Sequence, residues 1–105
     1  MIAVIFEVQP KPHLADKYFD LAAELRQDLE NADGFISVER FQSLSEDGKY
    51  LSLSFWRDRK AVDAWYAHAP HAAAQNQGRT EIFADYRIRV AEVLCDYDLA
   101  QGRPQ

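Results

Sequence analysis

The stretch KYLSLSFWRDRKAVDAWY, Lys49–Tyr66, changes its hydrophobic period half-way along, and this change indicates the fold. From Leu51 to Phe55 large apolar residues alternate with serine, which is typical of a β-strand with two different faces. Asp58 then supplies a side chain suited to capping a helix N-terminus. Beyond it, apolar residues gather near one face of a helical period. The stretch therefore predicts a strand over 49–57 that leads directly into a helix.

Three further strands are expected outside this stretch. Ile2–Val8 is rich in β-branched and aromatic residues, Phe35–Ser43 alternates, and Tyr86–Tyr97 carries apolar residues in a strand-like pattern. An Asp-Gly pair at 47–48 indicates a turn between the second and third strands.

Two helical regions separate these strands. Between Pro12 and Gly34 apolar residues recur at three- and four-residue steps, which predicts an amphipathic helix. Gly34 suits the left-handed conformation that often ends a helix. The second helix should break near His68, because Pro70 cannot lie in its middle. Pro70 can instead open a short helix that runs to about Gln77.

The order of elements is therefore β-α-β-β-α-β. It predicts an α+β, ferredoxin-like fold, in which an antiparallel sheet carries both helices on one face. One domain is expected over residues 1–98, followed by a loose tail over 99–105. Because the strands are apolar on both sides, the face without helices would be an exposed apolar patch. We therefore expect a homodimer in which the sheets of two copies pack against each other.

Composition narrows the class of protein further. Among 105 residues, 17 acidic side chains outnumber 12 basic ones, and the basic residues are scattered, so we expect no nucleic-acid binding. No apolar run approaches the roughly 18 residues of a membrane span, and the N-terminus lacks a signal-peptide pattern. The single cysteine, Cys95, cannot form an internal disulfide. We expect it to be buried in the last strand and the protein to be cytoplasmic.

Three sequence features together resemble one family. They are SFWRD at Ser54–Asp58, the A-x-x-x-W spacing from Ala61 to Trp65, and YRIRVAEV at Tyr86–Val93. Over nearly its whole length the chain resembles the antibiotic biosynthesis monooxygenase family. The resemblance implies a dimeric α+β barrel with a pocket between the helices and the sheet of each subunit. Some members of the family oxidise polycyclic phenols or quinols with molecular oxygen and no metal or flavin, so the resemblance implies such a reaction, while other members bind and degrade haem and many have no established reaction.

The haem-degrading members can be compared residue by residue. Trp65 matches a tryptophan that they carry on the second helix. This chain has Gln75 where they place an iron-ligating histidine, and Glu7 where they have an asparagine on the first strand. His71, about one helical turn before Gln75, is the nearest substitute. A histidine alone can ligate haem iron, so a haem-binding relative stays open as an alternative.

His68 and His71 are the candidate catalytic residues. A metal site is not expected, because Pro70 lies between them and no third ligand stands at a recognisable spacing. A histidine of near-neutral pKa could instead take the proton of a phenol held in a pocket. Alternatively, both imidazoles bond backbone carbonyls that the helix break leaves free.

Large aromatic and basic side chains supply the candidate substrate-binding residues. Trp56 and Trp65 are either core residues or the walls of a pocket for a flat aromatic substrate. Arg79 could bind an anionic group of that substrate, or pair with a nearby carboxylate. Tyr86, at the start of the last expected strand, completes the set.

Three functional classes follow. The first is a small cofactor-independent monooxygenase that acts on an electron-rich aromatic or quinol. The second is a non-catalytic dimer of the same fold that binds a small metabolite. The third is an isomerase or other proton-transfer enzyme that uses His68 or His71 without oxygen. No cofactor is expected, because the four glycines are isolated and form no phosphate-binding loop.

Overall fold

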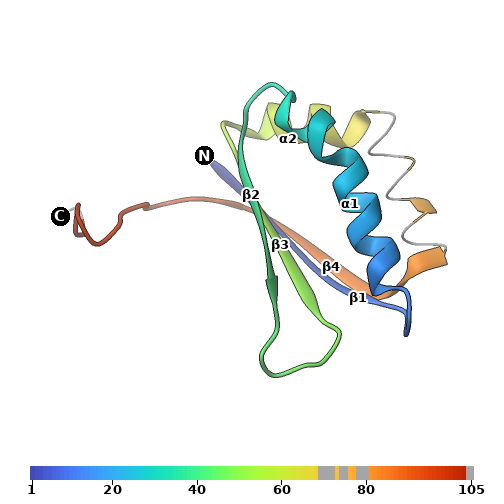
Figure 1. Cartoon of the computed structure of the whole chain (residues 1–105). Coiled ribbons are helices and arrows are strands. Elements are labelled where there is room, and N and C mark those ends of the chain that lie inside the picture. The colour runs from blue at the N-terminus through green and yellow to red at the C-terminus, as the bar shows by residue number, and fades with distance from the viewer. Residues whose placement is uncertain (69–72, 74–75, 78–80, 104–105) are drawn as a thin grey trace.

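The structure, a computed structural model, describes residues 1–68, 73, 76, 77 and 81–103. A four-stranded sheet forms one layer, and helices cover one of its faces (Figure 1). In chain order the elements are β1 (Ile2–Pro10), α1 (Ala15–Glu30), β2 (Phe35–Gln42), β3 (Tyr50–Trp56), α2 (Arg59–Ala67) and β4 (Phe83–Glu92). The α+β, ferredoxin-like prediction is confirmed.

The strands lie in the order β2-β3-β1-β4, and every neighbouring pair is antiparallel. In the centre of the sheet, Val4 of β1 pairs with Ser54 of β3 and with Val90 of β4. Directly paired residues point to the same face, and successive residues alternate between faces. The even-numbered residues of β1 and β3 therefore lie under the helices, and the odd-numbered ones lie on the other side.

Both ends of α2 agree with the sequence prediction. Asp58 caps the N-terminus, because its Oδ1 accepts the backbone N–H of Ala61 at 2.9 Å. His68 follows the last helical residue with an extended backbone. The short helix predicted from Pro70 to Gln77 lies largely outside the described residues. Among the described residues, no helix combines the length and the apolar character that crossing a membrane requires.

Gly34 fixes how the turn after α1 packs against α2. Its φ of 83° is in the left-handed region, as the sequence predicted. A Cβ at this position would come within 2.5 Å of the Ala61 Cβ. Glycine therefore allows both the backbone conformation and the close approach of the two segments.

The core consists of two clusters between the helices and the sheet. The first gathers around Trp56 and Trp65, together with Val4, Ala61 and Val62. The second gathers around Tyr18, together with Val8 and Ile82. The space between these clusters is where the cavity described below lies.

The face of the sheet without helices is apolar at its centre. We call this the open face and define it by Ala3, Ile5, Leu51, Leu53, Phe55 and Ala91. Figure 1 shows both labelled helices on the opposite side of the sheet. Leu51, Leu53 and Phe55 are partly exposed, although leucine and phenylalanine are commonly core residues. The apolar character of both sheet faces, expected from the sequence, is thus present in the structure.

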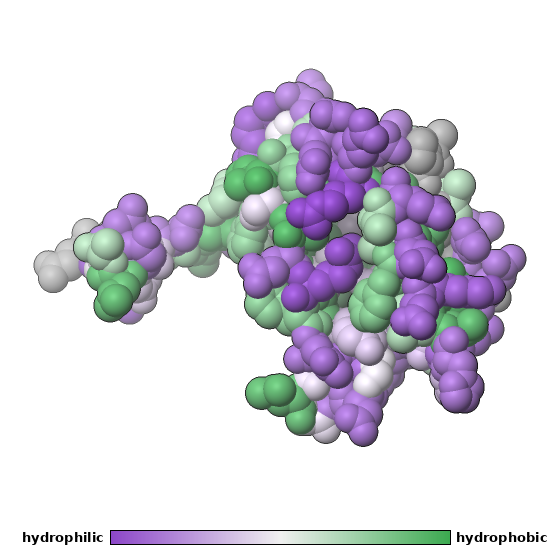
Figure 2. Space-filling view, viewed as in Figure 1, coloured by the Kyte–Doolittle hydropathy of each residue, from purple (hydrophilic) through white to green (hydrophobic). Residues whose placement is uncertain are grey.

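The last strand is displaced from its prediction. β4 spans Phe83–Glu92, whereas the sequence pattern predicted 86–97. Pairing with β1 ends at Ile2 and Glu92, and the Val93 N–H then donates to the Met1 carbonyl at 2.9 Å. The chain after β4 then runs away from the sheet (Figure 1), and the space-filling view shows it projecting from the rest of the molecule (Figure 2). Cys95 is consequently exposed, and the prediction that it is buried was wrong.

Candidate functional site

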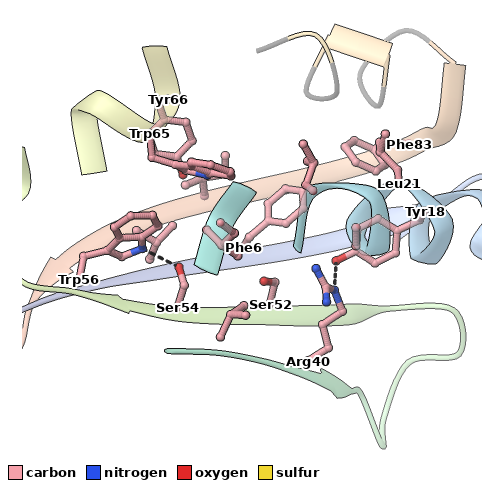
Figure 3. A pocket seen from close by; sticks show the side chains of 16 residues that line it. Phe6, Tyr18, Leu21, Arg40, Ser52, Ser54, Trp56, Trp65, Tyr66 and Phe83 are labelled. Atoms are coloured by element: carbon pink, nitrogen blue, oxygen red, sulfur yellow. Dashed lines mark hydrogen bonds between the residues drawn. The ribbon is translucent and has the colours of Figure 1, made fainter. Parts of the chain in front are cut away.

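A cavity of about 150 Å³ lies between the helices and the sheet. Figure 3 shows its walls, which are made of side chains from α1, α2 and all four strands of the sheet. Most of the lining is apolar, including Leu21 and Leu25 of α1 and Phe6 of β1. The cavity is partly open to solvent, so a small molecule can enter. A concave, mostly apolar pocket with a few polar groups is the usual form of a small-molecule site.

Two indole rings form one end of the cavity. The ring centroids of Trp56 and Trp65 are 6.1 Å apart, and their planes are inclined by 34°. Trp56 is held in place because its Nε1–H donates to the Oγ of Ser54 at 3.0 Å (Figure 3). Phe35 packs against Trp56 edge to face, with 5.4 Å between ring centroids. This end therefore presents rigid aromatic surface to any ligand.

A phenol and a guanidinium lie at the other end. Arg40 of β2 points from the sheet toward Tyr18 of α1, and its Nε donates to the Tyr18 hydroxyl at 3.3 Å (Figure 3). The same guanidinium lies 5.7 Å from the centroid of the Tyr18 ring. Tyr18 is only 4% exposed, whereas Arg40 is more accessible because β2 is an edge strand. The cavity is thus apolar along its length and cationic at one end.

The cavity exists because the covered face of β3 carries serines. Ser52 and Ser54 line it from below, where larger side chains would fill the space under the helices. The leucines that alternate with them lie on the open face. In an ordinary packed sheet the leucines of β3 would face the helices and the serines would face solvent, whereas here the serines face the helices.

The predicted site residues are distributed unevenly around this cavity. Trp56 and Trp65 both line it. His68 does not, but its ring stacks on the indole of Trp65 with 5.5 Å between centroids and 27° between planes. His68 is exposed and lies just after α2. The other predicted catalytic histidine, His71, and Arg79 lie outside the described residues.

Tyr86 and Glu7 lie away from the cavity. Tyr86 contacts Phe6 and Phe83, with 6.0 Å between ring centroids in each pair, but does not itself line the cavity. Glu7, which stands where haem-degrading members have an asparagine, points to the other side of the sheet. There its Oε2 accepts from Arg89 at 2.8 Å, and this bond lowers the pKa of the Glu7 carboxyl. Neither position therefore contributes directly to the cavity wall.

Tyr66 is the lining residue whose ionisation is clearly altered. Burial raises the pKa of its phenol, because a phenolate would lose its hydration. Tyr66 therefore stays protonated near neutral pH and is not a base. Among the described residues no carboxylate or imidazole lines the cavity, and no three His, Cys, Asp or Glu side chains come together in that part of the chain as a metal would require.

The sequence patterns did not indicate Tyr18 or Arg40 as site residues. Tyr18 lies within the helical pattern between Pro12 and Gly34, and Arg40 lies within the alternating stretch Phe35–Ser43. One available indication was that Arg40 and Val38 share a face of β2, so that a charge interrupts a face opposite Ser52 and Ser54. The sequence alone does not say which face of the sheet the helices cover, so this pattern could not identify Arg40 as a cavity residue.

The sequence profile of the antibiotic biosynthesis monooxygenase family matches residues 1–77. The chain belongs to this family. The protein named jasmonate monooxygenase ABM from Pyricularia oryzae is 48% identical over 90% of this chain, which covers 44% of that protein. The uncharacterized protein YqjZ of Bacillus subtilis is 35% identical over 57% of this chain and 51% of its own length. The chain thus spans about half the length of these two relatives.

Solved structures support the family fold. A putative antibiotic biosynthesis monooxygenase from Deinococcus radiodurans superposes with a TM-score of 0.80 at 17% identity, covering 94% of this chain and 98% of its own. The protein Rv0793 of Mycobacterium tuberculosis superposes with a TM-score of 0.82 at 19% identity, covering 92% and 98% of the two chains. At these identities the similarity establishes a shared fold and does not by itself transfer a reaction.

Proposed function

We propose that this protein is a cofactor-independent monooxygenase whose substrate is a small, electron-rich, single-ring molecule such as a hydroquinone. The observation that carries the proposal is the cavity of about 150 Å³ with two indoles at one end. An engineered cavity of about 150 Å³ binds benzene in another protein, so this volume suits one ring better than three. Membership of a monooxygenase family and the jasmonate monooxygenase relative support oxygenation as the reaction class.

The proposed reaction needs no cofactor because the substrate supplies all the electrons. A base removes a phenolic proton, and the ring carbon beside the phenolate oxygen then acts as the nucleophile toward molecular oxygen. One oxygen atom stays on that carbon, the O–O bond breaks, and the ring hydrogen leaves as a proton. Hydroquinone and one oxygen molecule thereby give hydroxyquinone and one water molecule. The apolar walls would favour this step by excluding water from the reacting anion.

His68 and His71 are the bases in this proposal. His68 lies against Trp65 at the edge of the cavity, and His71 follows three residues later in the chain. A positioned base typically contributes 10²- to 10⁴-fold to a rate. Tyr66 cannot take this role near neutral pH, because burial raises the pKa of its phenol.

An oxygen electrode tests the proposal with hydroquinones and substituted phenols, after correction for their spontaneous oxidation. We expect turnover by the wild type, and a loss of about 10²- to 10⁴-fold in the His68→Ala, His71→Ala double variant with unchanged thermal stability. The two single variants show which histidine is the base. Full activity in the double variant would mean that both histidines are structural. No oxygen uptake with any compound would reject the oxygenase.

Binding without chemistry is the second candidate function. The observation that favours it is the absence of any carboxylate or imidazole from the cavity lining in the described part of the chain. In that case a ligand would bind with high affinity and be recovered unchanged in the presence of oxygen.

We also propose that the protein is a cytoplasmic homodimer. The open face is the proposed contact, because its partly exposed leucines and phenylalanine would otherwise remain in water. A reducing compartment would keep the exposed thiol of Cys95 from oxidising.

A further inference from the structure

Among the described residues that line the cavity, Arg40 is the charged one. Elsewhere, Arg57 pairs with Asp33 at 3.0 Å and Arg89 pairs with Glu7 at 2.8 Å, while Arg87 of β4, outside the cavity, has no such pair among the described residues. Among the described residues, no carboxylate lies within salt-bridge distance of Arg40. Its one side-chain hydrogen bond there goes to the neutral hydroxyl of Tyr18. A cation thus lines the cavity without an anion from the described chain.

Arg40 and Tyr18 point their polar groups at the same part of the cavity. Because the Tyr18 hydroxyl accepts from the Arg40 Nε, it retains its own proton to donate. The Nη groups of Arg40 make no hydrogen bond to the other described residues. Figure 3 shows this guanidinium rising from β2 beside the cavity floor, with the phenol oxygen directly above it. Two kinds of donor are therefore available to one acceptor group.

The rest of the cavity restricts what can carry that acceptor group. Phe6 and Leu21 pack beside Tyr18 and, like Leu25, line the cavity, and the indoles close its far end. A doubly charged phosphate would face a single guanidinium there and lose most of its hydration. A carboxylate has the planar shape that the arginine fork matches, and it carries one charge.

We propose that the cavity binds a small monocarboxylic acid, with its carboxylate on Arg40 and Tyr18 and its apolar ring toward Trp56 and Trp65. Binding of the acid is independent of the proposed function, and only the statement that this acid is the substrate rests on it. Jasmonate, for which one relative is named, is an acid of this kind. The acid group would fix the orientation of the ring relative to His68, and Arg40 is the specificity-determining residue.

Tryptophan fluorescence measures this binding directly. The chain has two tryptophans, and both line the cavity, so a bound ligand changes the emission of the whole protein. The ligands are jasmonate and 3-phenylpropanoate, each compared with its methyl ester, which keeps the ring and loses the charge. Titrations without oxygen prevent turnover and separate binding from catalysis.

We expect each acid to bind at least about 10-fold more tightly than its ester. This factor is at the lower end of the range for a hydrogen bond to a charged group, because water partly screens the exposed Arg40. Arg40→Gln should remove this preference, while Arg40→Lys keeps the charge but loses the fork and should retain part of it. Arg59→Gln is the matched control, since Arg59 lies on α2 with a side chain that is 83% exposed. Tyr18→Phe should weaken the acids several-fold and leave the esters unchanged.

The outcomes separate this inference from the proposed function. Equal affinity for acid and ester, a preference that survives Arg40→Gln, or no binding of either acid would overturn the carboxylate site. If neutral phenols are still oxidised in those cases, the proposed oxygenase stands without it. If the acids bind through Arg40 and no hydroquinone or phenol is oxidised, the carboxylate site stands and the oxygenase fails.

Discussion

Ser52 and Ser54 are the residues on which the cavity depends. Both lie under the helices, where close packing usually requires larger apolar side chains. Their small size leaves the volume between Trp56 and Tyr18 unfilled, and the Oγ of Ser54 also orients the Trp56 ring. Polar residues at covered positions are therefore the sign of a binding site in this strand, and not of a surface facing solvent.

Replacement of Ser52 by leucine should fill the cavity. We expect Ser52→Leu to weaken binding of 3-phenylpropanoate at least about 10-fold, because the leucine occupies the space of the ligand ring. Thermal stability should stay the same or rise, since a void becomes apolar contact. Ser52→Ala is the matched control, which removes the hydroxyl and keeps the volume. Weak binding by both variants would show that the hydroxyl matters and the volume does not.

At the scale of the elements, α2 depends on its N-cap. The Ala61 N–H bond, and next the guanidinium of Arg57, lower the pKa of Asp58 below its ordinary value of 3.8. A lowered pKa means that the folded state favours the carboxylate. Its stabilising effect is therefore present above the unfolded-state pKa and is lost as the pH falls through the lower folded-state pKa.

Two substitutions of Asp58 test this cap. Asp58→Ala should lower the Tm by a few degrees at neutral pH, because the Ala61 N–H loses its acceptor. Asp58→Asn keeps a capping oxygen but does not titrate, so wild type should lose more stability than this variant between about pH 5 and pH 2. Parallel acid-denaturation curves for the two proteins would contradict the assignment. Circular dichroism melting at each pH provides the measurement.

Local patterns predicted elements well where the cause was local. The N-cap at Asp58, the left-handed turn at Gly34 and the end of α2 each depend on a few neighbouring residues. The structure confirms all three, with α2 ending at Ala67. The end of β4 was wrong because it depends on where β1 stops pairing, at Ile2. Cys95 was misplaced for the same reason.

At the scale of the whole molecule, alternation in β3 gives two faces but does not say which one the helices cover. Leu51, Leu53 and Phe55 would ordinarily be assigned to the core, and in the structure they lie on the open face. Tyr18 and Arg40 could not be paired from the sequence, since they lie 22 residues apart and meet only across the layers. The indoles were easier to select because large aromatic residues line most pockets.

The open face should make the protein a homodimer. Light scattering behind a sizing column is expected to give about twice the 12.1 kDa of one chain. Leu53→Glu should give monomers, because it places a charge at the centre of the buried contact. Asp20→Asn, on the outer side of α1, is a control that should remain dimeric. A wild-type protein that stays monomeric at micromolar concentration would contradict the proposal that a second copy packs on the open face.

The fate of labelled oxygen during turnover of a single-ring hydroquinone tests the proposed oxygenation. With ¹⁸O₂ we expect one labelled oxygen atom in the hydroxyquinone product and one in water for each oxygen molecule consumed. Ser52→Leu should abolish this incorporation and Ser52→Ala should preserve it, because the reaction takes place in the cavity. Incorporation that continues at the wild-type rate in Ser52→Leu, or oxygen uptake that places no label in the product, would contradict oxygenation of the substrate in this cavity.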